Sequence, residues 1–220
     1  MKRGTLVCMT GLDGAGKSTL TNNVVDRLQA QGYDAVQVYG RYLPKLTYPL
    51  IVVGRQTVFS SSDIEDDYED HQSEKENVFS NKRLAKAYEG VVMADYIPQF
   101  IWRVLRQLYT HDLVICDRYV YDTLLTDLAG DVLDTPQEAI DRYRMYSHVF
   151  PDPEYEFYVR VPPEVSMERK DDVPSIEYLR DRRSFYDAFA DAYDLSVLDG
   201  TESIDYLTGV VVGAITEQRR

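Results

Sequence analysis

The stretch GLDGAGKSTL, from Gly11 to Leu20, decides the fold, because it lies between two segments with different hydrophobic periods. Before it, the unbroken apolar and β-branched run from Thr5 to Met9 predicts a buried strand of a parallel sheet. After it, apolar residues at helical spacing predict a helix that begins near Lys17 and ends at Gly32. A glycine-rich turn therefore connects the end of a strand to the start of a helix.

The same stretch fits the pattern G-x-x-x-x-G-K-[ST], in the strand-turn-helix context that this pattern requires. Glycines let backbone N–H groups converge on phosphate oxygens, and the following helix adds the partial positive charge of its N-terminus. We expect Lys17 to reach the β and γ phosphates and the Ser18 hydroxyl to hold Mg²⁺. The predicted binding residues for a nucleoside triphosphate, with ATP as the donor, are Gly11, Gly14, Ala15, Gly16, Lys17, Ser18 and Thr19.

A second predicted strand ends in charged residues. The apolar run from Asp112 to Cys116 predicts this strand, and Asp117-Arg118-Tyr119 follows it. Because ligands gather at the carboxyl ends of parallel strands, Asp117 is a candidate to hold Mg²⁺ through water. Arg118 can neutralise charge on a phosphoryl group during transfer. An exposed ion pair that caps the strand is the alternative interpretation of these two residues.

The rest of the chain alternates strands with helices. Strands are predicted at 35–39, 155–161 and 195–198, and helices at about 82–110, 120–129, 136–148, from 162, 175–193 and 204–217. Pro98 is expected to bend or divide the first of these helices. The alternation predicts one α/β domain over residues 1–220, with a parallel sheet covered by helices on both faces.

The segment from Ser60 to Asn77 is rich in acidic residues and serine and poor in bulky apolar residues. This composition predicts a solvated, mobile insertion. A lid or a partner surface is the alternative, because long loops often carry function.

The chain carries a formal net charge of -13, from 37 acidic and 24 basic residues. An acidic surface repels polyanions, which argues against nucleic acid polymers and anionic membranes as partners. No apolar run is long enough to span a membrane, so we expect a cytoplasmic protein.

Cys8 and Cys116 lie in apolar runs and are expected to be buried and reduced. Scarce lysine and abundant aspartate favour a halophilic-type surface, whose self-repulsion high salt would screen.

Basic residues cluster at Arg169-Lys170 and again between Arg180 and Arg183. On a helix, Arg180 and Arg183 share a face, whereas Arg182 points elsewhere. Arginine suits phosphate because its planar fork donates two hydrogen bonds at once. We therefore expect at least one of these residues to contact ATP or the transferred group, with solvated surface charge as the alternative.

GLDGAGKST at 11–19 and VICDRY at 114–119 resemble the two best motifs of the thymidylate kinase family of P-loop nucleoside monophosphate kinases. The resemblance implies a five-stranded parallel sheet in the order 2-3-1-4-5 and an arginine-bearing lid at about 166–176. It also implies that Asp13, Arg41, Arg118 and Tyr119 bind the acceptor and that Arg169 lies in the lid near ATP. Members commonly form homodimers through helices, and the apolar segment from Val91 to Ile101 is a candidate for such a contact or for core packing.

The chain departs from this family on the acceptor side. Arg41 is followed by Tyr42-Leu43-Pro44-Lys45, where the family has glutamate, proline and glycines. Tyr96 stands where the family's middle helix has an arginine, and the Tyr-Gln pair that reads thymine is missing from the stretch Asp122 to Leu128. The resemblance therefore supports the donor chemistry more strongly than it supports thymidylate as the acceptor.

The predicted reaction is transfer of the γ-phosphoryl group from MgATP to a small acceptor, in the first place a deoxynucleoside monophosphate such as dTMP. A nucleoside or sugar kinase and a nucleotide-binding regulatory ATPase are the alternatives. The candidate catalytic residues are Lys17, Asp117, Arg118 and Asp13. A phosphate acceptor needs no general base, whereas a hydroxyl acceptor would use Asp13.

Overall fold

The computed structural model describes residues 3–45, 82–129, 132–170 and 174–217. Within these residues, five strands form one sheet in the order β2-β3-β1-β4-β5, and all four neighbouring pairs are parallel. The strands are β1 (Thr5–Thr10), β2 (Ala35–Tyr39), β3 (Leu113–Asp117), β4 (Tyr155–Arg160) and β5 (Ser196–Asp199). The predicted strand order is therefore confirmed.

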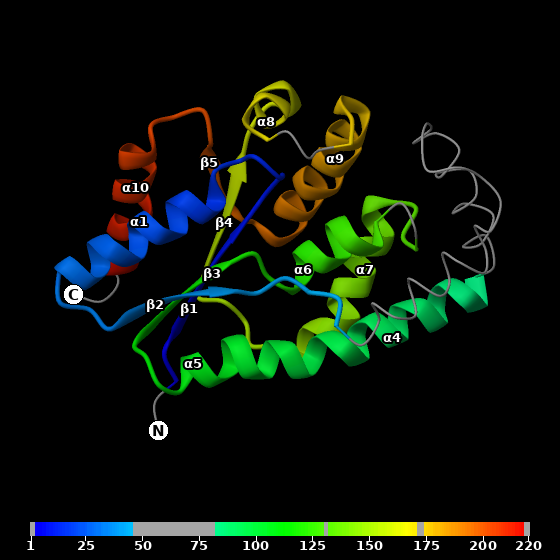
Figure 1. Cartoon of the computed structure of the whole chain (residues 1–220), viewed down its shortest axis with the longest axis horizontal. Helices are drawn as coiled ribbons and strands as arrows, with labels where there is room; N and C mark the ends of the chain where they lie inside the picture. Colours follow the sequence, from blue (N-terminus) through cyan, green and yellow to red (C-terminus); the bar gives the residue numbers. More distant parts are fainter. Residues whose placement is uncertain (1–2, 46–81, 130–131, 171–173, 218–220) are drawn as a thin grey trace.

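Helices cover both faces of the sheet, so the molecule has the three layers expected of a P-loop α/β fold (Figure 1). One face carries α1 (Lys17–Ala30) and α10 (Ile204–Glu217), which pack against each other. The other carries α4 (Lys82–Phe100), α5 (Arg106–Leu108), α7 (Pro136–Tyr146) and α9 (Ile176–Tyr193). The remaining helical segments are shorter: η1 (Ile101–Leu105), α6 (Val120–Asp122), η2 (Thr123–Leu128), η3 (Ser147–Val149) and α8 (Pro163–Arg169).

The strands β1 and β3 are central and almost wholly buried, as their unbroken apolar sequences predict. Their register places Thr5 beside Leu113 and Met9 beside Asp117, so both strands end at the same edge. Cys8 and Cys116 are direct neighbours in this register, and both are buried and free. The site described below lies at the edge where these strands end.

The helix α4 differs from its prediction at Pro98. The α-helix continues through Pro98 to Phe100, and the change comes at Ile101, where a π-helical segment, η1, follows. Proline lacks the N–H that would bond to the preceding turn, yet the residues on both sides of Pro98 keep the α-helical conformation. Pro98 thus does not divide the helix at its own position.

Side chains of α4 and η1 also reach solvent. Val91 is 42% exposed, Ile101 is 50% exposed and Trp102 is 68% exposed. These residues include part of the segment considered for a subunit contact. No helix within the described ranges is both long enough and apolar enough to span a membrane.

Two predicted segments lie partly or wholly outside the described residues. The acidic segment at 60–77 lies wholly outside them. Of the predicted lid at 166–176, residues 166–169 form the end of α8 and residue 176 begins α9, while residues 171–173 lie outside the described part.

Candidate active site

The glycine-rich turn between β1 and α1 forms a loop whose backbone only glycine readily adopts. Gly14 and Gly16 have φ angles of 81° and 87°, in the left-handed region. Gly14 also lies against α8, because an added Cβ there would be 2.5 Å from the Ser166 carbonyl oxygen. No side chain caps the first turn of α1, and that turn contains no acidic residue. The N-terminus of α1 is therefore a favourable place for an anion.

Lys17 is the first residue of α1, and its side chain folds back over this loop. Its Nζ donates a hydrogen bond to the Leu12 carbonyl oxygen at 2.5 Å, and the residue is 4% exposed. Burial lowers the pKa of Lys17 to about 7, and the nearby Arg118 cation contributes in the same direction. Phosphate oxygens beside the loop would relieve both effects, because they would pair with the ammonium group.

Ser18 and Asp117 meet across the gap between α1 and the end of β3. The Ser18 hydroxyl donates to Asp117 Oδ2 at 2.5 Å. Asp117 Oδ1 is buried and has no hydrogen-bond partner among the described residues. A buried carboxylate oxygen without a partner is costly, and a hydroxyl beside it completes an oxygen-rich pair suited to Mg²⁺. Because Mg²⁺ usually keeps several waters and phosphate oxygens as ligands, two protein ligands are sufficient.

Arg118 directs its guanidinium group into the same site. It is a non-glycine residue with a φ of 68°, and its N–H donates to the Met9 carbonyl oxygen at 2.9 Å. This strained backbone turns the side chain, which is only 6% exposed, towards the loop. Its Nη2 donates to Asp13, and its Nη1 donates to Asp122 at 3.2 Å. The guanidinium thus bridges the loop to α6.

Asp122 is a buried site residue that sequence analysis missed. Its Oδ1 accepts hydrogen bonds from Thr10 at 2.8 Å, Tyr186 at 2.8 Å and Arg118, and its Oδ2 accepts from the Tyr119 N–H at 2.8 Å. The available signal is its position four residues after Arg118 at the start of a predicted helix, where opposite charges can pair.

Asp13 lies on the other side of the Arg118 guanidinium. Besides Arg118, Lys170 is a partner, with its Nζ 3.8 Å from Asp13 Oδ1. Burial would raise the pKa of Asp13, but the cations Arg118, Lys17 and Arg41 outweigh it and hold this pKa below its ordinary value. The Ser166 hydroxyl donates to the Asp13 carbonyl oxygen, which ties the loop to α8. Asp13 is therefore ionised at neutral pH.

Arg41 follows β2 and faces a carboxylate that the sequence did not reveal. Its Nε donates to Asp127 Oδ2 at 2.9 Å, and its Nη2 donates to Asp127 Oδ1. Arg41 and Asp127 are 86 residues apart, so no local pattern relates them. The Arg41 guanidinium contributes to the lowered pKa of Asp13, so it lies within electrostatic range of that carboxylate.

The structure does not bring every predicted residue to this group. The Tyr119 side chain is fully buried, donates to the Pro151 carbonyl oxygen and packs 5.5 Å from the Phe100 ring. Arg169 lies at the end of α8 and donates to the Gly200 carbonyl oxygen at 3.1 Å. Ala15 is buried in the loop, whereas Thr19 is exposed on α1. The Tyr119 side chain thus belongs to the aromatic core, away from the position where an acceptor contact was expected.

The arginines of α9 have separate roles. Arg180 is exposed and pairs with Glu164 of α8 at 3.1 Å. Arg182 is buried, with its guanidinium carbon 4.9 Å from the Tyr178 ring centre and its Nη2 2.5 Å from the Ala129 carbonyl oxygen. Because Arg182 points into the protein, its predicted difference in direction from Arg180 is confirmed.

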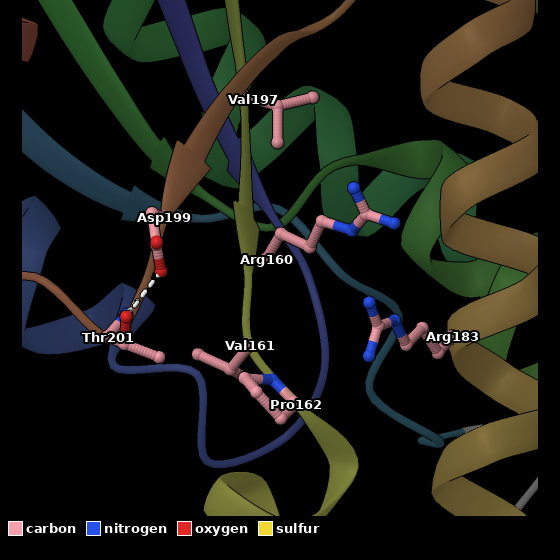
Figure 2. A pocket seen from close by; sticks show the side chains of 7 residues that line it. All are labelled: Arg160, Val161, Pro162, Arg183, Val197, Asp199 and Thr201. Atoms are coloured by element: carbon pink, nitrogen blue, oxygen red, sulfur yellow. Dashed lines mark hydrogen bonds between the residues drawn. The ribbon is translucent and has the colours of Figure 1, made fainter.

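A separate cavity of about 480 Å³ lies where β4 and β5 end (Figure 2). It is lined by Arg160, Val161, Pro162, Arg183, Val197, Asp199 and Thr201. Figure 2 shows Arg160 and Arg183 extending into the gap between β4 and α9. Both pair with Asp187, at 3.1 Å and 3.3 Å, which leaves one positive charge in excess within this trio.

The fold, the glycine-rich loop and the Ser18–Asp117 pair define a P-loop nucleotide-binding protein. The sequence model of a family described as NTPase matches residues 6–118, from β1 to the end of β3, and the chain belongs to this family. The chain is also similar to "Probable thymidylate kinase 2" of Saccharolobus solfataricus, with 27% identity over 168 residues. That match covers 76% of this chain and 64% of the relative.

Proposed function

We propose that the protein is an ATP-dependent phosphotransferase that moves the γ-phosphoryl group to a small acceptor, with a nucleoside monophosphate as the first candidate. One observation carries the proposal: the Arg118 guanidinium lies between Asp122 and Asp13 at the strand edge where Ser18 meets Asp117. A guanidinium beside a nucleotide-phosphate loop can neutralise charge that develops during phosphoryl transfer. The similarity to a probable thymidylate kinase supports a nucleotide as the acceptor.

On the donor side, the chain supplies backbone N–H groups, one ammonium group and two oxygen ligands. The N–H groups of the loop and of the first turn of α1 would bind the phosphates, with Lys17 paired to their terminal oxygens. Ser18 and Asp117 would hold Mg²⁺, which supplies positive charge to the phosphate oxygens when it is bound. These contacts position the triphosphate without any covalent chemistry from the protein.

The nucleoside part of the donor has a candidate location beside the loop. The cavity at the ends of β4 and β5 lies at the same edge of the sheet as the loop, and its volume of about 480 Å³ is typical of small-molecule sites. Arg169 lies at its border through the contact with Gly200, next to the cavity residue Thr201. We therefore place the predicted ATP contact of Arg169 here.

On the acceptor side, Asp13 is paired with Arg118, and Arg41 lies within electrostatic range of Asp13. A monophosphate acceptor would bring an ionised oxygen as nucleophile, so Arg41 and Arg118 would bind and orient it without a general base. A hydroxyl acceptor would need its proton removed, and the ionised Asp13 would accept that proton.

One observation favours the second possibility, a nucleoside or sugar kinase. Arg41 is already paired with Asp127 through two donors, and Arg118 is paired with two carboxylates. Cations whose charge is already balanced bind an acceptor phosphate less strongly than unpaired cations do. This balance of charge favours an uncharged hydroxyl acceptor.

The purified protein, incubated with MgATP and a panel of nucleosides, nucleotides and sugars, tests the proposal. Acceptor-dependent release of ADP, with a matching phosphorylated product resolved by chromatography, is the expected result. Release of phosphate at the same rate with and without every acceptor would instead identify a regulatory ATPase. If only nucleosides or sugars are phosphorylated, they replace the monophosphate as the proposed acceptor.

A further inference from the structure

The segment from Gly40 to Lys45, which carries Arg41, is held by side chains of one helix. Tyr96 donates through its hydroxyl to the Gly40 carbonyl oxygen. Arg103 Nη2 donates to the Arg41 carbonyl oxygen at 3.2 Å, and Gln99 Nε2 donates to the Leu43 carbonyl oxygen at 2.8 Å. Asp95 Oδ2 accepts from the Lys45 N–H and from the Tyr42 hydroxyl, each at 3.1 Å. All of these contacts are to backbone atoms of the segment, except the contact between Asp95 and the Tyr42 hydroxyl.

The holding side chains are also joined to one another. Gln99 donates to Asp95 Oδ1 at 3.1 Å, and its own Oε1 accepts from Arg103 Nη2 at 2.8 Å. Asp95, Gln99 and Arg103 follow at intervals of four residues, so they share one face of the helix. The last interval enters the π-helical segment η1, whose wider turn keeps Arg103 on this face.

Tyr96 shows how α4 acts on the acceptor side. The residue has no exposed surface, and its ring stacks on the Phe150 ring with 5.7 Å between the ring centres. Position 96 therefore offers no charge to a bound molecule. The helix α4 acts instead through the backbone of the segment that carries Arg41.

We propose that Asp95, Gln99 and Arg103 form a positioning network that fixes the backbone around Arg41 and thereby sets the affinity for the acceptor. This inference rests on the proposed function. Asp127 holds the guanidinium end of Arg41, and the network holds its backbone end. An arginine fixed at both ends loses little further freedom when it binds an acceptor, so the network lowers the entropic cost of binding.

Arg103→Met tests the network, because methionine keeps most of the length of the side chain and removes its donors. Within the described residues, Arg103 donates to the carbonyl and amide oxygens of Gln99 and to the Arg41 carbonyl oxygen, so the change breaks no ion pair there. The matched control is Arg106→Met, one turn further on, where the exposed guanidinium lies 4.8 Å from the Trp102 ring centre. Arg103→Lys, which keeps a donor, should restore part of the lost effect.

The first measurement is hydrogen exchange of the ligand-free protein in peptides that cover residues 40–45. Arg103→Met should speed exchange there roughly tenfold, as expected for the loss of hydrogen bonds from a charged donor, while Arg106→Met should leave it unchanged. Equal exchange in the two variants overturns the inference, whatever the acceptor is. If Arg103→Met does not fold, Gln99→Met removes the donor to the Leu43 carbonyl oxygen and makes the same prediction.

The second measurement uses whichever acceptor supports turnover in the panel assay. Arg103→Met should raise the KM for that acceptor roughly tenfold and leave the KM for ATP within about twofold, because the donor side has no part in the network. Equal changes in both KM values would overturn the positioning role. If no acceptor supports turnover, the proposed function fails and the acceptor half of the inference fails with it, whereas the exchange result still decides whether α4 fixes this segment.

Discussion

The proposed donor and acceptor halves of the site are built in different ways. The donor half comes from one continuous stretch, the glycine-rich loop with the start of α1, plus Asp117 at the end of β3. The acceptor half is assembled from segments far apart in the sequence, in which Arg41 meets Asp127 and Arg103 from other elements. The donor half therefore depends on local backbone geometry, and the acceptor half depends on a tertiary network of side chains.

The largest expected effect belongs to the donor half. Lys17→Ala removes the ammonium group buried over the loop and should lower kcat/KM by roughly a thousandfold or more, because single groups that stabilise a transferring phosphoryl group have this magnitude. Steady-state kinetics with MgATP measures it, and Lys86→Ala, an exposed lysine on α4, is the control. Normal turnover in Lys17→Ala would show that the loop and Lys17 do not bind the donor phosphates as proposed.

Asp117→Asn should have the next largest effect. Asparagine keeps the shape of the side chain but loses the charge that would hold Mg²⁺ beside Ser18, so kcat/KM should fall by roughly a hundredfold. The Mg²⁺ concentration for half-maximal rate should rise as well. A variant with the same Mg²⁺ dependence as the original protein would show that Asp117 serves only the fold.

Asp122 connects the two halves, and its replacement should act on stability. Asp122→Asn removes the charge that Arg118 and three further donors share, and it should lower the free energy of unfolding by about 2 kcal/mol. Urea denaturation measures this. The control Asp141→Asn breaks an exposed pair with Arg144 and should cost no more than about 0.5 kcal/mol. Equal losses in both variants would contradict a connecting role.

The last prediction concerns the pH dependence of stability. The pKa of Lys17 is about 7 in the folded chain and 10.5 ordinarily, so between these values the unfolded chain binds the extra proton. Stability should therefore rise with pH across this window, by at most about 1.4 kcal/mol per pH unit from this group. The difference in unfolding free energy between the original protein and Lys17→Met, measured at pH 7 and pH 9, isolates it. If the unfolding free energies of the two proteins change in parallel with pH, the pKa of Lys17 is not lowered in the folded protein.

Sequence alone reached the donor half because its signals are local. The run from Thr5 to Ser18 contains the strand, the turn and the start of the helix, and Asp117 follows an unmistakable buried strand. Parallel strands of this kind must end at one edge, so the meeting of Ser18 with Asp117 follows from fold class alone. The same local reasoning placed all five strands in the chain.

The acceptor half was not accessible in this way, because its partners are chosen by tertiary packing. Nothing near Arg41 indicates Asp127, and nothing near Arg118 indicates Tyr186 of α9. Tyr119 shows a different limit, since the family resemblance implied an acceptor contact while its ring lies in the aromatic core. The shift from Pro98 to Ile101 likewise depends on hydrogen bonding that residue type alone does not fix.

The two adjacent thiols of the central sheet have a practical consequence. Cys8 and Cys116 are fully buried neighbours, and burial first, with the Cys116 thiol second, raises the pKa of Cys8 well above its ordinary value. Reagents that react with thiolates can therefore reach these sulfurs only when the layers that cover the central sheet open. The chain thus contains its own chemical reporter of opening at the centre of the sheet, on which the P-loop and Asp117 both depend.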